Sequence, residues 1–185
     1  MPAFAPGLSG ASYLTNSMTA ETTTPPAAPA QASGPLFYRQ PLPLQSDKHA
    51  NWRLRPGSLA FAAETNAIPA VIGEFGMAAQ HFPILFTGQD ASPIVAVGLA
   101  RRNLFVADGK WADDTYAPAY LRRYPFVFMQ SEEDGNFLLA LDADSEQVNQ
   151  GVSDEGEPLF VDGKATELVD NAMKFCADFT REHEQ

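Results

Sequence analysis

The apolar residues of this chain come in short runs that turn-forming residues interrupt, and this pattern limits the folds open to it. The longest runs are Phe82–Phe86, Pro93–Ala100 and Phe137–Leu141. A helix that crosses a bilayer needs ~20 consecutive apolar residues, so no membrane span is expected. Runs of this length are typical of strands. Because apolar residues still make up 45% of the chain, a folded core is expected as well.

The clearest supersecondary signal is a pair of apolar runs in the second half of the chain. Phe126–Gln130 and Phe137–Asp142 flank a polar loop that contains Asp134-Gly135. This pattern predicts a β-hairpin. Because both runs are almost continuously apolar, we expect both faces of the hairpin to be covered and the pair to lie centrally in a sheet. By the same reasoning Phe82–Phe86 predicts a buried strand.

Helical periodicity is strongest near the C-terminus. From Thr166 to Glu184 the apolar residues fall on one stripe, which consists of Leu168, Val169, Ala172, Met173, Phe175, Cys176 and Phe179. Val71–His81 predicts one short helix that Pro83 ends, and Ala117–Tyr124 predicts a helical turn. With the short runs, these elements predict an α+β fold: mostly antiparallel sheet, short helices and one C-terminal amphipathic helix.

The first 35 residues differ in composition from the rest. Ala, Pro, Thr, Ser and Gly supply 26 of them. Such a segment cannot bury enough apolar area to offset its backbone entropy, so residues 1–35 are predicted to be a disordered tail and 36–185 a single domain. Met18 lies within the tail, and translation from there is an open alternative to a start at Met1.

Charge is distributed unevenly along the chain. The formal net charge is −11, and residues 128–185 hold 3 basic and 15 acidic residues. A field of this sign repels phosphate backbones, which argues against nucleic-acid binding. Residues 1–35 contain no Lys or Arg and no sustained apolar stretch, so no secretory signal is recognisable and a cytoplasmic location is expected.

No motif specifies a reaction, a cofactor or a metal. His49, His81 and His183 lie in separate segments without the spacing of a zinc site. Cys176 is the only cysteine and belongs to the apolar stripe, which favours a buried, inert thiol. A structural role is likewise favoured for His81, although a binding role remains open. No cofactor and no metal ion are predicted.

One cluster combines aromatic side chains with arginines in the middle of the chain. Its members are Asn103, Trp111, Tyr116, Tyr120, Arg122, Arg123 and Tyr124. Aromatic rings beside arginine can stack, bind a carboxylate or line a groove for a peptide. The alternative is that these side chains cover the rim of the sheet. Because an unpaired buried guanidinium is costly, at least one of the two adjacent arginines should face outward or pair with a carboxylate.

Several sequence blocks resemble the SapC family of bacterial proteins. The most specific are Glu74-Phe75 with His81-Phe82-Pro83-Ile84, and the block from Tyr116 to Phe126 that reads Tyr-Ala-Pro-Ala-Tyr-Leu-Arg-Arg-Tyr-Pro-Phe. The resemblance runs in order from Leu36 to about Phe179. It implies an association with surface-layer formation and serum resistance, and it carries over no catalytic or ligand residues. The like-named peptide-transport permease is a different protein.

The resemblance and the residue patterns together favour one functional class over another. The favoured class is a non-catalytic accessory or surface-layer-related protein that binds another protein or peptide through the cluster. The alternative is an enzyme of unrecognised type that uses His81 or His49 with a carboxylate. The family domain is longer than this one, so a further C-terminal segment is expected beyond the Thr166–Glu184 helix.

Overall fold

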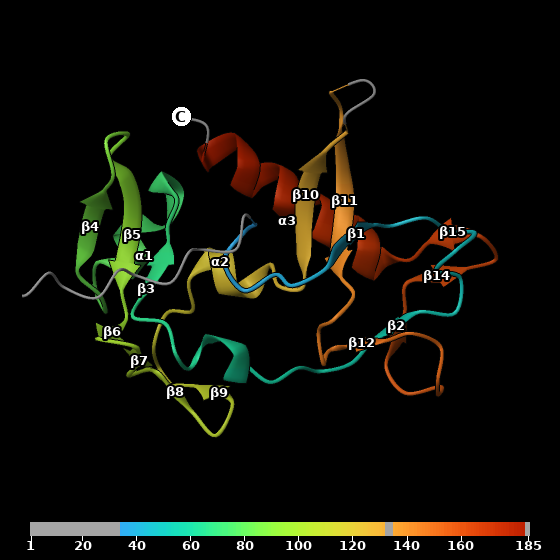
Figure 1. Ribbon diagram of the computed structural model, residues 1–185, viewed down its shortest axis with the longest axis horizontal. Helices are drawn as coiled ribbons and strands as arrows, with labels where there is room; N and C mark the ends of the chain where they lie inside the picture. The colour runs from blue at the N-terminus through green and yellow to red at the C-terminus, as the bar shows by residue number, and fades with distance from the viewer. Residues whose placement is uncertain (1–33, 132–134, 184–185) are drawn as a thin grey trace, which may run out of the picture. The chain divides into compact units, whose positions relative to one another are not determined.

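A computed structural model of the chain describes residues 34–131 and 135–183. The compact unit that begins at Gly34 contains short antiparallel strands and a few helices, which is the predicted α+β class (Figure 1). The predicted disordered tail falls almost wholly on residues 1–33, outside the described residues. In the described part of the chain, no helix is both long and apolar enough to span a membrane.

The predicted hairpin is present and forms most of the first sheet. β10 (Phe126–Gln130) pairs with β11 (Phe137–Asp142) in antiparallel register, and β1 (Pro41–Pro43) pairs with the other side of β11. The strand order is therefore β1-β11-β10. Only β11 is central, and β10 lies at the edge of the sheet, which corrects the expectation that both strands are central.

Both faces of the hairpin are covered near its base, as its apolar sequence predicts. Leu139 and Leu141 pack into one buried cluster, while Ala140 and Val127 pack into the other. Alternate residues of a strand face opposite sides of the sheet, so the two clusters lie on its two faces. Phe137 lies near the tip of the hairpin, where its side chain is exposed.

A second three-stranded sheet has the order β3-β5-β4. Its strands are β3 (Ala67–Pro69), β5 (Ser92–Ala96) and β4 (Ile84–Thr87). The prediction of a buried strand over Phe82–Phe86 is wrong for most of that run. Phe82 is buried, but it precedes the strand, and Leu85 and Phe86 are exposed. Strand side chains point to the two faces of a sheet, so this exposure means that the described chain leaves both faces of β4 partly uncovered at these positions.

The remaining strands form small antiparallel ladders. One sheet has the order β12-β2-β13, and three two-stranded ladders are β6·β7, β8·β9 and β14·β15. Their bounds are Val148–Asn149 for β12, Arg53–Leu54 for β2, Glu157–Pro158 for β13, Gly98–Leu99 for β6, Arg102–Asn103 for β7, Val106–Ala107 for β8, Lys110–Trp111 for β9, Phe160–Val161 for β14 and Lys164–Ala165 for β15.

Two of these ladders turn through Asp-Gly pairs with positive φ at both positions. Asp108 and Gly109 have φ of 50° and 73°, and Asp162 and Gly163 have the same two values. Gly and Asp tolerate this left-handed region better than most residues do, which explains why they stand at these hairpin turns.

The helices before α3 are short. They are the 3-10 turns η1 (Ala60–Ala62) and η2 (Ile72–Glu74) and the α-helices α1 (Phe75–Ala78) and α2 (Ala119–Arg122). The single helix predicted over Val71–His81 is thus split into η2 and α1. Two glycines within that segment lower its helical stability, which accounts for the short length.

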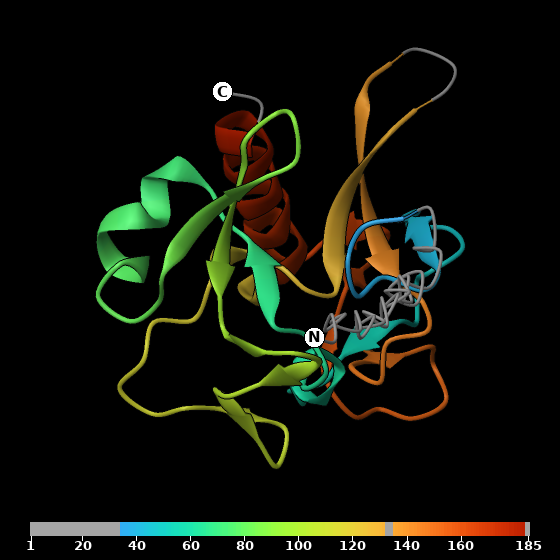
Figure 2. The same ribbon diagram turned by 60° about the vertical axis from the view of Figure 1, so that its left-hand side comes forward.

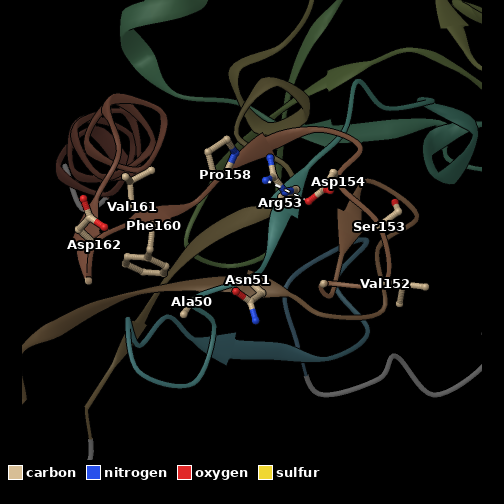
Figure 3. A pocket seen from close by; sticks show the side chains of 12 residues that line it. Ala50, Asn51, Arg53, Val152, Ser153, Asp154, Pro158, Phe160, Val161 and Asp162 are labelled. Atoms are coloured by element: carbon tan, nitrogen blue, oxygen red, sulfur yellow. Dashed lines mark hydrogen bonds and ion pairs between the residues drawn. The ribbon is translucent and has the colours of Figure 1, made fainter.

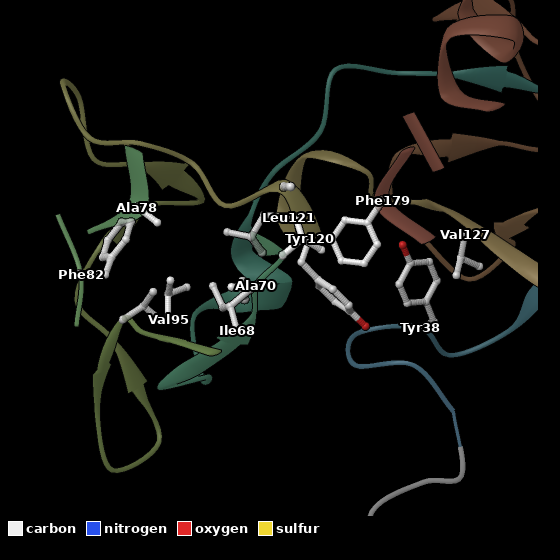
Figure 4. Packing of buried hydrophobic residues seen from close by; sticks show 14 of the residues in the cluster. Tyr38, Ile68, Ala70, Ala78, Phe82, Val95, Tyr120, Leu121, Val127 and Phe179 are labelled. Atoms are coloured by element: carbon white, nitrogen blue, oxygen red, sulfur yellow. The ribbon is translucent and has the colours of Figure 1, made fainter. Parts of the chain in front are cut away.

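α3 (Glu167–His183) is the long helix near the C-terminus, as predicted. Val169, Cys176 and Phe179 are buried on it. The first two belong to the cluster that contains Leu141, and Phe179 belongs to the other cluster, where it faces Tyr120 and Tyr38 (Figure 4). Met173 was expected on the buried stripe, but 46% of its surface is exposed.

Candidate functional site

A buried carboxylate joins three segments beside α3. Glu74 is 5% exposed. Its Oε1 accepts a hydrogen bond from the backbone N–H of Val71 at 3.1 Å, and its Oε2 accepts from the N–H of Ala119 at 2.7 Å and the hydroxyl of Tyr116 at 2.9 Å. The bond to Val71 follows from the local sequence, since a Glu three residues into a helical turn can reach back to its start. The carboxylate therefore holds η2, α2 and the loop before α2 together.

Arg122 is held in place at the surface above this carboxylate. Its Nε donates to the carbonyl of Ala117 at 3.0 Å, and its Nη2 donates to the hydroxyl of Tyr116 at 3.0 Å. The guanidinium carbon lies 5.1 Å from the centroid of the Phe175 ring and 5.5 Å from that of Tyr116. Within the described residues no ion pair involves Arg122. Its Nη1 also has no hydrogen-bond acceptor there.

The hydroxyl of Tyr116 connects Arg122 to Glu74. It donates to the carboxylate and accepts from the guanidinium. Burial raises the pKa of Tyr116, and the neighbouring carboxylate raises it further, while Arg122 partly offsets both effects. The phenol is consequently neutral at physiological pH and keeps its proton on the hydrogen bond to Glu74.

These groups line one end of a hollow of about 240 Å³, which we call the Arg122 hollow. Its other walls include Met77 and Phe175, and two acidic residues of α3 lie at its rim. Both acidic groups have donors of their own: Asp178 accepts from Arg181, and Glu182 accepts from the N–H of Gly73 at 3.0 Å. Among the described residues that line the hollow, Arg122 is the one cationic group, and it is therefore the one that can donate charged hydrogen bonds to a ligand.

The adjacent arginine lies in the core. Arg123 is 9% exposed, and its guanidinium carbon lies 4.2 Å from the ring centroids of both Tyr120 and Phe179 and 5.8 Å from that of Tyr38. Contact with aromatic faces compensates part of the cost of burying the charge. The expectation that at least one arginine of the pair faces outward is confirmed by Arg122. Tyr120 and Arg123 brace the core beneath the hollow.

Trp111 and Asn103 lie beside the site rather than in it. The indole N–H of Trp111 donates to the carbonyl of Tyr116 at 3.2 Å, and its ring stacks on Phe105 at 5.7 Å. Asn103 is buried, where its Nδ2 donates to the carbonyl of Ala62 and its Oδ1 accepts from the N–H of Phe105. Trp111 therefore supports the loop that carries Tyr116.

Tyr124 and His81 lie away from the Arg122 hollow. The hydroxyl of Tyr124 donates to the buried carboxylate of Asp142 at 3.0 Å, and burial raises the pKa of the phenol to about 12. Its ring lines a different hollow, of about 210 Å³, with Arg39 and Phe61. His81 is half-buried next to Phe82. The structure thus brings Tyr116 and Arg122 together and separates them from Tyr124 and His81.

Another hollow, of about 660 Å³, lies between two loops near β2 (Figure 3). Arg53 on its wall donates to the carbonyl of Gly156 at 3.1 Å and pairs with Asp154 at 3.4 Å. Its charge is already matched by a partner of this chain. Buried Asn149 shapes the loop by donating to Ser153 and accepting from the N–H of Val152. None of the residues predicted as binding candidates lines this hollow.

The histidines have local partners. His49 accepts a hydrogen bond from the N–H of Gln45 at its Nδ1 and packs on Trp52 with ring centroids 4.3 Å apart. None of the three hollows is lined by a histidine. Among the residues that the structure describes, no group of three or more His, Cys, Asp or Glu side chains could hold a metal ion.

Glu74 is the organising residue of this site that sequence reasoning missed as a candidate. Its signal was present, because Glu74-Phe75 opens one of the two blocks that carry the family resemblance. Phe175 was predicted on the apolar stripe of the C-terminal helix, and Met77 was not singled out. Their meeting at one hollow depends on how their two helices pack.

The fold and the site define a small α+β protein with one ordered arginine at the mouth of a partly apolar hollow. A SapC family model matches residues 44–185, which is most of the chain, and the chain therefore belongs to the SapC family. Comparison with curated proteins and with solved structures found no significant match.

Proposed function

We propose that this SapC-family chain is a non-catalytic accessory or surface-layer-related protein that binds another polypeptide at the Arg122 hollow. The observation that carries the proposal is the fixed guanidinium of Arg122, which two hydrogen bonds and the Phe175 ring hold in place. A cation whose position is already set loses little entropy when it binds a carboxylate. It also presents the planar donor geometry that carboxylates match.

The walls of the hollow support a peptide as the ligand. Met77 is 53% exposed, and Phe175 is half-buried beside Arg122. A polypeptide that supplies an Asp, a Glu or a C-terminal carboxylate next to an apolar side chain could pair its carboxylate with Arg122 and pack its apolar side chain on Met77 and Phe175. Aromatic and arginine side chains around a pocket are the composition that binding hot spots favour.

The alternative, an enzyme with a His–carboxylate pair, has no comparable support. Its main requirement is an imidazole and a carboxylate that converge in one pocket. His49 instead binds a backbone N–H through Nδ1. We therefore propose the binding function alone.

Selection from a displayed random-peptide library tests this function. Peptides with a carboxylate beside an apolar residue should be enriched on the wild-type chain. Arg122→Ala should lower the affinity of selected peptides by about tenfold or more, because a hydrogen bond to a charged group contributes roughly 1.5–3 kcal/mol.

Arg101→Ala is the matched control, because Arg101 is an exposed arginine paired with Glu64 away from the hollow. It should leave the affinity of the selected peptides unchanged. Equal binding by the wild type and Arg122→Ala, with both folded by circular dichroism, would contradict the proposal.

A further inference from the structure

β4 forms an open edge of the β3-β5-β4 sheet. It pairs with β5 on one side, and the part of the chain that the structure describes places no strand on its other side (Figure 1). Figure 2 shows the same strand from a second direction. An open edge presents unpaired backbone N–H and C=O groups and can pair with another strand.

The register identifies the groups that face outward. The N–H of Ala96 donates to the carbonyl of Pro83, so these two residues form a hydrogen-bonded pair. Such pairs alternate along an antiparallel ladder, and Leu85 with Ile94 is the next one. Leu85 and Thr87 therefore turn their backbone groups toward β5. Ile84 and Phe86 turn theirs to the open edge, where no backbone partner exists for them among the described residues.

The sequence of β4 leaves this edge without the usual protection. Natural edge strands commonly carry charges or an outward-facing proline. Pro83 belongs to the set of residues that faces β5, so it removes no donor from the open side. Leu85 and Phe86 are 49% and 62% exposed. From Phe75 to Ala100, Asp90 is the one residue with a formal charge at pH 7.

We propose that β4 pairs in antiparallel orientation with β4 of a second copy of this chain. The charge distribution selects this occupant. Each chain carries a formal net charge of −11, so most approaches of two copies bring like charges together. Pairing through β4 instead brings an uncharged segment against its own uncharged copy. This self-association does not depend on the peptide-binding function proposed for the Arg122 hollow.

Two-fold symmetry allows registers centred on Ile84, Leu85 or Phe86, and the one centred on Leu85 pairs the outward groups of both Ile84 and Phe86. Ile84 of each copy exchanges both backbone hydrogen bonds with Phe86 of the other. Leu85 then lies opposite Leu85 of the second copy, in a position without hydrogen bonds between the two residues. Cα atoms in such pairs lie about 4.5 Å apart. This separation falls within the range that a disulfide bridges.

The central Leu85 pair makes the register testable by cross-linking. Leu85→Cys is introduced into the full chain, which is then treated with a mild oxidant and analysed without reductant. The proposal expects a covalent dimer to form about tenfold faster than from Leu99→Cys, because only position 85 would meet disulfide geometry. Leu99 is the matched control, since it is 79% exposed on β6. The native Cys176 is buried and does not compete.

Sedimentation of the unmodified protein provides the second measurement. The wild type should show concentration-dependent dimerisation, and Leu85→Lys should be monomeric because two ammonium groups would meet at the symmetry axis. Leu99→Lys should dimerise as the wild type does. A wild type that stays monomeric, or cross-linking from position 85 no faster than from position 99, overturns the proposal. If Leu85→Lys fails to fold, the two cysteine variants decide the question.

Discussion

β11 and β4 begin from similar apolar sequences and reach opposite surroundings. β11 (Phe137–Asp142) is buried over its last four residues, whereas Leu85, Phe86 and Thr87 of β4 are exposed. β11 has a strand on each side, and buried clusters cover both faces of its sheet. β4 has one neighbouring strand. β10 also has one neighbouring strand, yet its Phe126 and Val127 are buried. The comparison teaches that apolar sequence predicts a strand, while the segments that pack over its faces decide whether its side chains are buried.

The two strands should differ most in how much stability the protein loses when a leucine in each strand is truncated to alanine. Leu141→Ala removes a side chain with no exposed surface and should lower the free energy of unfolding by about 2–5 kcal/mol. Leu85→Ala should cost less than about 1 kcal/mol, because half of its side chain already contacts water. Urea denaturation of both variants measures the two values. Equal losses would show that β4 is as well covered as β11.

The polar residues that end the two strands give a second contrast. The carboxylate of Asp142 accepts from the N–H groups of Arg39 and Gln40 and from the Tyr124 hydroxyl. Asp142→Ala leaves these donors unpaired in the interior and should cost roughly 1–3 kcal/mol. Thr87 donates to the carbonyl of Ser92 at the exposed end of β4. Thr87→Ala should stay within about 0.5 kcal/mol of the wild type.

Asp142→Asn serves as the matched control for this site. It preserves the shape and one acceptor oxygen, so its loss in urea denaturation should be smaller than that of Asp142→Ala. Identical losses in the Asn and Ala variants would assign the effect to charge rather than to the backbone hydrogen bonds.

Thiol labelling compares the covered helix with the open edge. Cys176 is buried, and burial raises the pKa of its thiol to about 11. Because the thiolate is the reactive form, alkylation of native, reduced protein at neutral pH, at a concentration too low for pairing through β4, should be at least about tenfold slower at Cys176 than at Leu85→Cys. Mass spectrometry of the labelled peptides measures both rates. Rapid native labelling of Cys176 would show that α3 opens readily, whereas labelling only in urea is the expected result.

The smallest expected effect is a change in the pH dependence of stability, and it comes from His49. Burial lowers the pKa of His49 below 6.5, and Lys48 lowers it further. The unfolded chain therefore binds a proton before the folded chain does. This contribution to stability is complete above about pH 6.5 and is lost as the pH falls toward the folded pKa.

His49→Gln removes this pH-dependent contribution to the free energy of unfolding. The free energy of unfolding of the wild type should fall more between about pH 7.5 and about pH 5.5 than that of the variant. An equal fall in both proteins would show that protonation of His49 does not contribute.

Much of the fold was predictable from sequence because the signals are local. The hairpin of β10 and β11, the long helix α3 and the Asp-Gly turns all depend on residues within a few positions of one another. Backbone φ preferences and side-chain periodicity act over that range. The split of Val71–His81 into η2 and α1 shows the limit, since a short helix with two glycines has little local stability.

The candidate site was predictable in part. Sequence reasoning selected Tyr116 and Arg122 and required that one of the two adjacent arginines face outward. It did not distinguish Arg122 from Arg123. Both lie at the C-terminal end of α2, where adjacent side chains point to different sides of the helix, and the sequence of so short a helix does not show which side is buried. Phe179 and Tyr38, which surround Arg123, are far from it in sequence.

The sequence by itself determined the class of fold, the places where the chain turns and the acidic character of its last third. Only the tertiary structure decided that Arg123 enters the core, that Glu74 is buried beneath Tyr116 and that β4 lies at an edge. The physical reason is the range of the interactions. Turns and helices are set by neighbouring residues, whereas burial depends on segments that meet across long separations, as Asp142 does with the backbone of Arg39.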